Sequence, residues 1–166
     1  MYFLTELTPD DFQPVAPGHI AAGVAASGTR YKVSSICATK DRDSAQAWKQ
    51  IEALKSNDQE PAFKSLLHFV QIARMGPPLT QHLDKKQVHE AHEFVSAVSG
   101  KTEKIWRYRR GDIRILFYYA DGQVVLVTEL VAKRSDKLEK AILNRAEQAV
   151  NEYLKAVQSK KIVAAT

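Results

Sequence analysis

The sequence predicts an α+β fold, in which a small twisted antiparallel β-sheet of three to four strands packs against an N-terminal αα-hairpin and a C-terminal helix. Side chains at alternate positions form two faces over residues 105–109 and 113–119, as expected of strands. Asp121-Gly122 then separates two apolar runs, which strongly indicates a β-hairpin because glycine adopts positive φ without steric cost. Apolar residues at helical spacing precede and follow this region.

The length of 166 residues corresponds to one domain that can bury a hydrophobic core. Prolines and glycines are dense between residues 9 and 28, so we expect residues 1–29 to form a partly ordered N-terminal extension. The domain is expected over residues 30–158, and residues 159–166 are expected to be a frayed tail. The composition, 45% apolar and 26% charged, is ordinary for a soluble globular protein.

The first half of the domain is expected to be one strand followed by two helices. Residues 31–38 are partly β-branched and alternate, which predicts the strand. Asp41 or Asp43 can cap a first helix over about 43–56, where apolar residues recur at helical spacing. A second helix is predicted to open at Glu60-Pro61 and to stop at Gly76-Pro77-Pro78, because proline is tolerated in a first turn and ends a helix elsewhere.

The second half is expected to be a helix, a three-stranded meander and a closing helix. Val88, Ala91, Val95 and Val98 recur at helical spacing and predict a helix over about 83–98. The three strands follow, with turns at Gly111-Asp112 and Asp121-Gly122. Residues 136–139 then fit a capping box, and an apolar stripe predicts a helix that ends near residue 158.

Positive charge is concentrated in the predicted sheet. Residues 101–114 contain six basic and two acidic side chains, a net charge of +4 against +5 for the whole chain. Alternation places Arg107 and Arg109 on one face and Trp106 and Tyr108 on the other. Arginines on one sheet face suit bidentate phosphate binding, which indicates an anionic partner; a solvated sheet face is the alternative.

Other chemical signals in the chain are weak. His89-Glu90-Ala91-His92-Glu93 has its histidines three residues apart rather than four and has no evident third ligand, so a solvated helix face is favoured over a metal site. Cys37 lies in an apolar run, excludes an internal disulfide and fits a reducing cytosol. We find no glycine-rich phosphate loop, no secretory signal and no apolar run long enough to span a membrane.

The order of these features resembles the RelE/ParE toxin superfamily, especially its HigB-like, phage-derived branch. The resemblance covers about residues 31–153 and is carried by several short stretches together rather than by one diagnostic motif. These are Tyr31-Lys32-Val33, Gly76-Pro77-Pro78-Leu79, Trp106-Arg107-Tyr108-Arg109, residues 111–118 and residues 131–137. The sequence departs from the family in lacking a tyrosine near Lys140, in a longer segment 79–104, and in the extension 1–29.

The resemblance implies the toxin component of a type II toxin–antitoxin system, acting in the cytoplasm as a ribosome-dependent mRNA endoribonuclease. It implies a cognate antitoxin, the ribosome and mRNA as partners, with no metal, no other cofactor and no membrane. The alternatives are a non-catalytic protein of this superfamily that binds gyrase or another protein, and a prophage nucleic-acid-binding module. The missing tyrosine near Lys140 bears on cleavage more than on fold.

The resemblance also assigns roles to basic residues, since metal-free cleavage needs proton transfer and cations for the developing charge on phosphorus. Arg114 and Arg109 are expected to hold the scissile phosphate, and Lys133 or Arg134 to assist proton transfer or neutralise charge. RNA or its phosphates are expected to be bound by Arg107, Arg110, Lys104 and Lys137. His89 or His92 is a further candidate acid or base, because histidine titrates near neutral pH.

Overall fold

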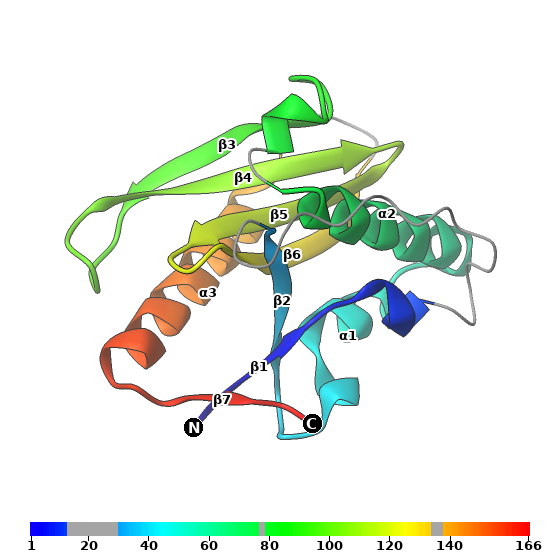
Figure 1. The fold of residues 1–166 in the computed structure, drawn as a ribbon. Coiled ribbons are helices and arrows are strands. Elements are labelled where there is room, and N and C mark those ends of the chain that lie inside the picture. Colours follow the sequence, from blue (N-terminus) through cyan, green and yellow to red (C-terminus); the bar gives the residue numbers. More distant parts are fainter. Residues whose placement is uncertain (13–29, 77–78, 134–137) are drawn as a thin grey trace.

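The computed structural model describes residues 1–12, 30–76, 79–133 and 138–166. Within them the chain forms one seven-stranded sheet and three α-helices (Figure 1). The strands are β1 (Tyr2–Glu6), β2 (Lys32–Cys37), β3 (Val88–Val95), β4 (Thr102–Arg110), β5 (Ile113–Ala120), β6 (Val124–Ala132) and β7 (Ile162–Ala164). The helices are α1 (Gln46–Glu52), α2 (Ser56–Arg74) and α3 (Lys140–Gln158), with short 3₁₀ turns at Pro9–Phe12, Arg42–Ser44 and Leu79–Gln81.

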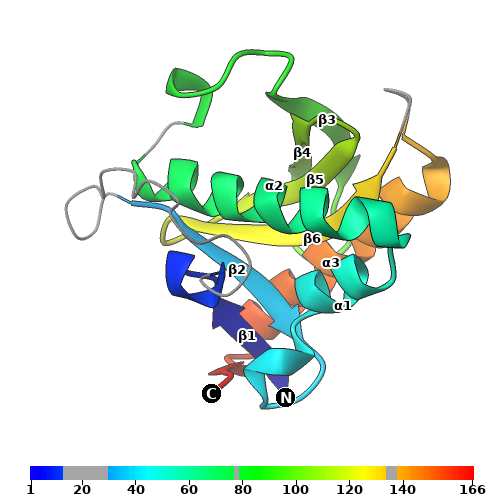
Figure 2. The same cartoon turned by 90° about the vertical axis from the view of Figure 1, so that its right-hand side faces the viewer.

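The sheet has the strand order β3-β4-β5-β6-β2-β1-β7 and mixed strand directions. Strands β3 to β6 form an antiparallel meander, whereas β2 runs parallel to β6 and β7 runs parallel to β1. Helices α1 and α2 cover one face and α3 covers the other, as the two views show (Figures 1 and 2). Two hydrophobic cores therefore lie on opposite faces of the sheet.

Burial on both faces explains why the central strands are almost continuously apolar. Phe117 of β5 packs on Phe69 of α2, with ring centroids 4.9 Å apart. Its neighbour Leu116 points to the opposite face, into the core that also contains Leu126 and Val150. A strand covered on both faces has no solvent side and so loses the apolar–polar alternation of an exposed sheet.

The expected antiparallel sheet of three to four strands is wrong, because the sheet has seven strands and mixed directions. Part of the error is the helix predicted over residues 83–98, where the structure has strand β3. A β-bulge between Glu90 and His92 shifts the register with β4 by one residue. Such a bulge breaks the period of two. Val95 is 73% exposed and Val98 lies beyond the strand, so the helical spacing of the apolar residues did not correspond to one buried face.

The two ends of the chain also join the sheet. The predicted extension 1–29 contributes β1, which pairs with β2, while residues 13–29 lie outside the described part of the chain. The expected frayed tail 159–166 is wrong over most of its length, because β7 pairs with β1 and Ala165 N donates to Leu4 O at 2.9 Å. Three- to five-residue strands carry too few positions to show a period, which explains why the sequence did not reveal them.

The remaining elements follow the prediction. Strand β2, the presence of α1 and α2, and the β4–β5–β6 meander are confirmed, although α1 is shorter than the expected 43–56 and α2 begins at Ser56 rather than at Glu60-Pro61. The expected N-terminal αα-hairpin is wrong, because β1 and β2 precede the two helices in the chain. The β5–β6 turn has Gly122 at φ 76°, as the Asp-Gly signal requires. Helix α3 ends at Gln158 as predicted, but Glu139 makes no side-chain cap, and Asp136, the expected capping partner, lies outside the described residues. So do Pro77 and Pro78.

Candidate nucleic-acid interface

The strand register gathers four of the predicted basic residues on the α3 side of the sheet. Arg109 of β4 lies directly opposite Arg114 of β5, and Arg107 is two residues from Arg109 on the same face, as predicted. Lys133 follows β6 two residues after Val131, the partner of Arg114, and its backbone N–H donates to Asp112 O at 2.6 Å. We call Arg107, Arg109, Arg114 and Lys133 the basic face.

Two members of the basic face are buried and bind backbone carbonyls. Arg114 is 1% exposed, and its Nη1 donates to Gly111 O at 2.7 Å and to Ile113 O at 3.2 Å. Arg107 is 5% exposed, and its Nη2 donates to Lys86 O at 3.3 Å. Arginine stays protonated even when buried, so both residues contribute positive potential from below the surface.

Lys133 lies at the end of the basic face that adjoins α3. Its Nζ is 2.8 Å from Oε1 of Glu139, the residue before the helix. The hydrogen bond and charge of Lys133, with a further contribution from Arg145, lower the pKa of the Glu139 carboxyl. Glu139 itself is exposed, so an anion approaching Lys133 would compete with a solvated carboxylate rather than with a buried one.

A buried carboxylate, Glu129 of β6, lies beside the basic face. Glu129 is 3% exposed and pairs with Leu116, where a bulge shifts the β5–β6 register. Its Oε2 accepts from Nε2 of Gln50 at 2.9 Å, and its Oε1 accepts from Nε of Arg145 at 3.3 Å. Oε1 of Gln50 in turn accepts from the backbone N–H of Leu130 at 2.8 Å.

Opposing effects act on the Glu129 carboxyl. Burial raises its pKa, and the charge and hydrogen bond of Arg145, with the hydrogen bond of Gln50, counteract part of that rise. Sequence reasoning missed this group because its partners come from α1 and α3, far away in the chain. The one signal available was a single acidic residue inside the apolar run 124–132.

The two candidate histidines lie on β3 rather than on a helix. His89 is directly opposite Arg107 in the β3–β4 register, so it shares the side of the basic face. His92 lies further along, with Nε2 3.6 Å from Oε1 of Glu147 on α3. In the described part of the chain, no cluster of three or more His, Cys, Asp or Glu side chains could hold a metal ion.

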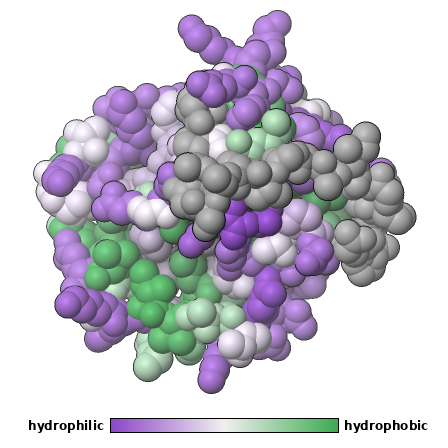
Figure 3. All heavy atoms as spheres, viewed as in Figure 1, coloured by the Kyte–Doolittle hydropathy of each residue, from purple (hydrophilic) through white to green (hydrophobic). Residues whose placement is uncertain are grey.

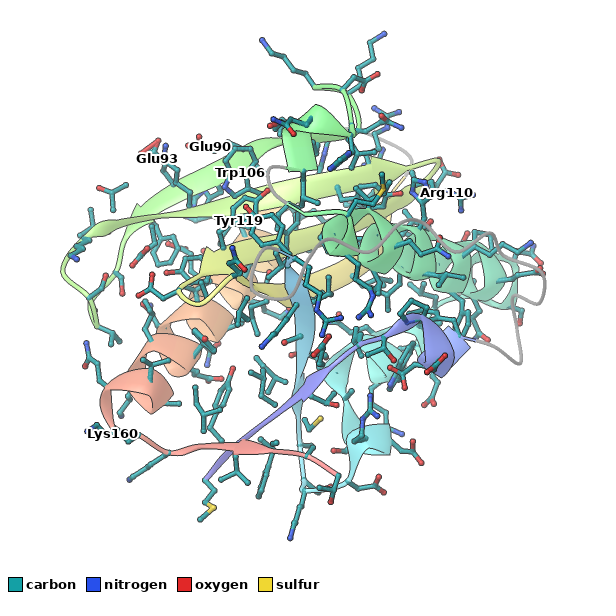
Figure 4. The ribbon with its side chains drawn as sticks, in the orientation of Figure 1. Glu90, Glu93, Trp106, Arg110, Tyr119 and Lys160 are labelled. Carbon is teal, nitrogen blue, oxygen red and sulfur yellow. The ribbon has the colours of Figure 1, made fainter. Side chains whose placement is uncertain are left out.

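Two other predicted phosphate-binding residues, Lys104 and Arg110, are not part of the basic face. Lys104 lies on the α2 side of β4 and forms an ion pair with Glu90 at 3.4 Å. Arg110 is at the end of β4 and lines a shallow hollow with the first residues of α2, away from Glu90 and Trp106 (Figure 4). Arg134 and Lys137 lie outside the described residues.

Two side chains that could have been functional are part of the core or its margin. Trp106 is half-buried and packs edge-on against Tyr119 with ring centroids 5.4 Å apart. Cys37 is buried, and burial is the largest of the influences that raise the pKa of its thiol. Neither environment is typical of an activated nucleophile or of an open base-stacking platform.

One part of the surface is apolar. Apolar side chains gather at the lower left of Figure 3, over the region where α3 ends and β7 begins in Figure 1. In this part of the chain, Leu154 and Ile162 are half-buried and Val157 is 46% exposed. Contiguous apolar surface of this kind is a common feature of protein-binding sites.

Comparison with known proteins provides no further assignment. The chain matches no protein-family model, no curated protein and no solved structure. Among the described residues, no helix combines the length and apolar character that crossing a membrane requires.

Proposed function

We propose that this protein is a RelE/ParE-like toxin that cleaves mRNA on the ribosome. The observation that supports this proposal is that His89 lies on the same side of the sheet as the basic face, directly opposite Arg107. Cations that bind the scissile phosphate and a neighbouring group that titrates near neutral pH are what a metal-free ribonuclease needs. Cleavage of this kind would take place in the cytoplasm.

The proposed reaction uses the 2′-hydroxyl of the substrate as the nucleophile. Neutral His89 accepts the hydroxyl proton as the 2′-oxygen bonds to phosphorus, and the bond from phosphorus to the 5′-oxygen breaks. Lys133 gives a proton to the departing 5′-oxygen, so the products are a 2′,3′-cyclic phosphate and a 5′-hydroxyl. Arg109 and Lys133 neutralise the charge on the phosphate oxygens as the bonds exchange.

The buried arginines have a different role in this proposal from the one expected from the sequence. Arg114 donates to the carbonyls of Gly111 and Ile113, so we assign it to holding the β4–β5 turn. Arg107 likewise holds the carbonyl of Lys86 at the start of β3. An antitoxin would neutralise the protein by covering Arg109 and Lys133, which are only partly buried.

The test is a purified cell-free translation reaction on a defined mRNA, with and without ribosomes, followed by primer extension. We expect cuts that require ribosomes and that are lost in Arg109→Ala. Arg110→Ala is the matched control, because this neighbouring arginine lies away from the basic face, and it should cut normally. Intact mRNA with the wild-type protein in the presence of ribosomes would refute the proposal.

Binding to gyrase or another protein without catalysis is the second candidate function. The apolar surface at the lower left of Figure 3 favours it, because nucleic-acid binding does not require such a surface. Saturable binding to one purified protein, with no cleavage of mRNA and no binding of RNA, would support this alternative. Salt-dependent binding of any nucleic acid without cleavage would instead indicate a nucleic-acid-binding module.

A further inference from the structure

We infer that Arg145 of α3 is a further phosphate-binding residue of the basic face, oriented by the buried carboxylate of Glu129. This inference rests on the proposed function, because it takes the anionic partner to be RNA. Arg145 was not among the basic residues that the sequence indicated. It belongs to the first half of α3, the helix that packs over the strands carrying the basic face.

The contact between Glu129 and Arg145 orients the guanidinium group. Oε1 of Glu129 accepts from Nε of Arg145 at 3.3 Å, so this bond uses the inner nitrogen and not Nη1 or Nη2. The side chain of Arg145 is 55% exposed, whereas that of Glu129 is 4% exposed. Within the described residues Nη1 and Nη2 make no hydrogen bond, and two parallel donors of this kind suit a phosphate.

The anchor itself is rigid. Nε2 of Gln50 holds the second oxygen of Glu129, and the backbone N–H of Leu130 holds the amide oxygen of Gln50. Because these hydrogen bonds hold the Glu129 carboxylate in place, its contact with Nε limits the orientations that the Arg145 side chain can adopt. Pre-orientation lowers the entropy that arginine loses when it binds a ligand.

The position of Arg145 relative to Lys133 supports a shared site. Lys133 is bonded to Glu139, and Arg145 is close enough to Glu139 to affect the ionisation of its carboxyl. Lys133 and Arg145 therefore both act on one exposed carboxylate at the start of α3, Lys133 by a hydrogen bond and Arg145 by its charge. An anionic ligand that displaces Glu139 from Lys133 would be attracted by the charge of Arg145 as well.

The experiment measures binding of a short fluorescein-labelled single-stranded RNA over a range of salt concentrations. Arg145→Gln should weaken binding about fivefold and lower the slope of log affinity against log salt by about 0.7, the value for one lost phosphate contact on a single strand. Lys160→Gln removes the same charge beyond the far end of α3 (Figure 4) and should change neither quantity as much. Equal effects in the two variants would overturn the inference.

Glu129→Met tests the orienting role, because this role and simple electrostatics predict opposite changes in the affinity for RNA. Removing a negative charge should strengthen RNA binding if only net charge matters. If Glu129 orients Arg145, the variant should bind RNA more weakly, and tighter binding would contradict the role. If circular dichroism shows that Glu129→Met does not fold, Arg145→Lys is used instead, because it keeps the positive charge but loses the Nε contact. RNA binding by Arg145→Lys equal to that of the wild type would overturn the orienting role.

The outcome is separable from that of the proposed function. Wild-type protein that binds RNA and responds to these variants as expected, but leaves mRNA intact on ribosomes, would refute cleavage and retain this site. Wild-type protein that fails to bind the RNA probe at low salt would overturn the site, whatever the translation assay shows.

Discussion

Replacing Gln50 by alanine should destabilise the protein more than its position on a short helix suggests. The amide donates to Glu129 at 2.9 Å and accepts from the backbone N–H of Leu130 at 2.8 Å. A hydrogen bond to a charged group contributes about 1.5–3 kcal/mol and a neutral one about 1 kcal/mol, so losing both should cost about 2–4 kcal/mol. Typical domains have a free energy of unfolding of only about 5–15 kcal/mol, so this loss would be large.

The free energy of unfolding is measured by urea titration of the wild type and Gln50→Ala at several pH values. The cost should increase as the pH rises through the folded-state pKa of Glu129, because the ionised carboxylate needs the amide donor more than the protonated carboxyl does. Gln148→Ala is the matched control, because Gln148 is exposed and makes only a 3.4 Å bond to Glu152. A loss in Gln50→Ala no larger than in this control would refute the reasoning.

Three further predictions concern stability. The pKa of the Glu129 carboxyl is raised in the folded state, so its contribution to stability is present below the unfolded-state pKa, about 4.3, and is lost as the pH rises through the folded-state pKa. Urea titrations should therefore show a loss of stability with rising pH in the wild type but not in Glu129→Gln. Parallel pH profiles for the two proteins would contradict this. Phe69→Ala removes a fully buried ring between α2 and the sheet and should lower the free energy of unfolding, measured by urea titration, by about 3–5 kcal/mol. A decrease under about 1 kcal/mol would mean that this ring is not packed against Phe117. Gly122→Ala places a side chain at φ 76° and should lower the free energy of unfolding, measured by thermal unfolding, by about 1 kcal/mol. An unchanged free energy would show that the turn can rearrange to accept the side chain.

The basic face shows how far local sequence reasoning extends towards a site. Alternation correctly placed Arg107 and Arg109 on one face, because the period of a strand is a local property. Alternation cannot show that α3 covers that face, and so it could not predict that Arg114 would be 1% exposed and bonded to carbonyls. The role expected for Arg114 at the phosphate depended on an exposure that only packing determines.

The sequence by itself determined the elements whose signals are local. These are the meander with its Asp-Gly turn, strand β2, the two helices after it and the apolar stripe of α3. Only the tertiary structure decided the sheet's full extent, because β1 and β7 are short and the bulge in β3 breaks its period. The contacts of Glu129 with Gln50 and Arg145 were likewise beyond the sequence, since their partners lie 79 and 16 residues away and meet only when α1 and α3 pack against β6.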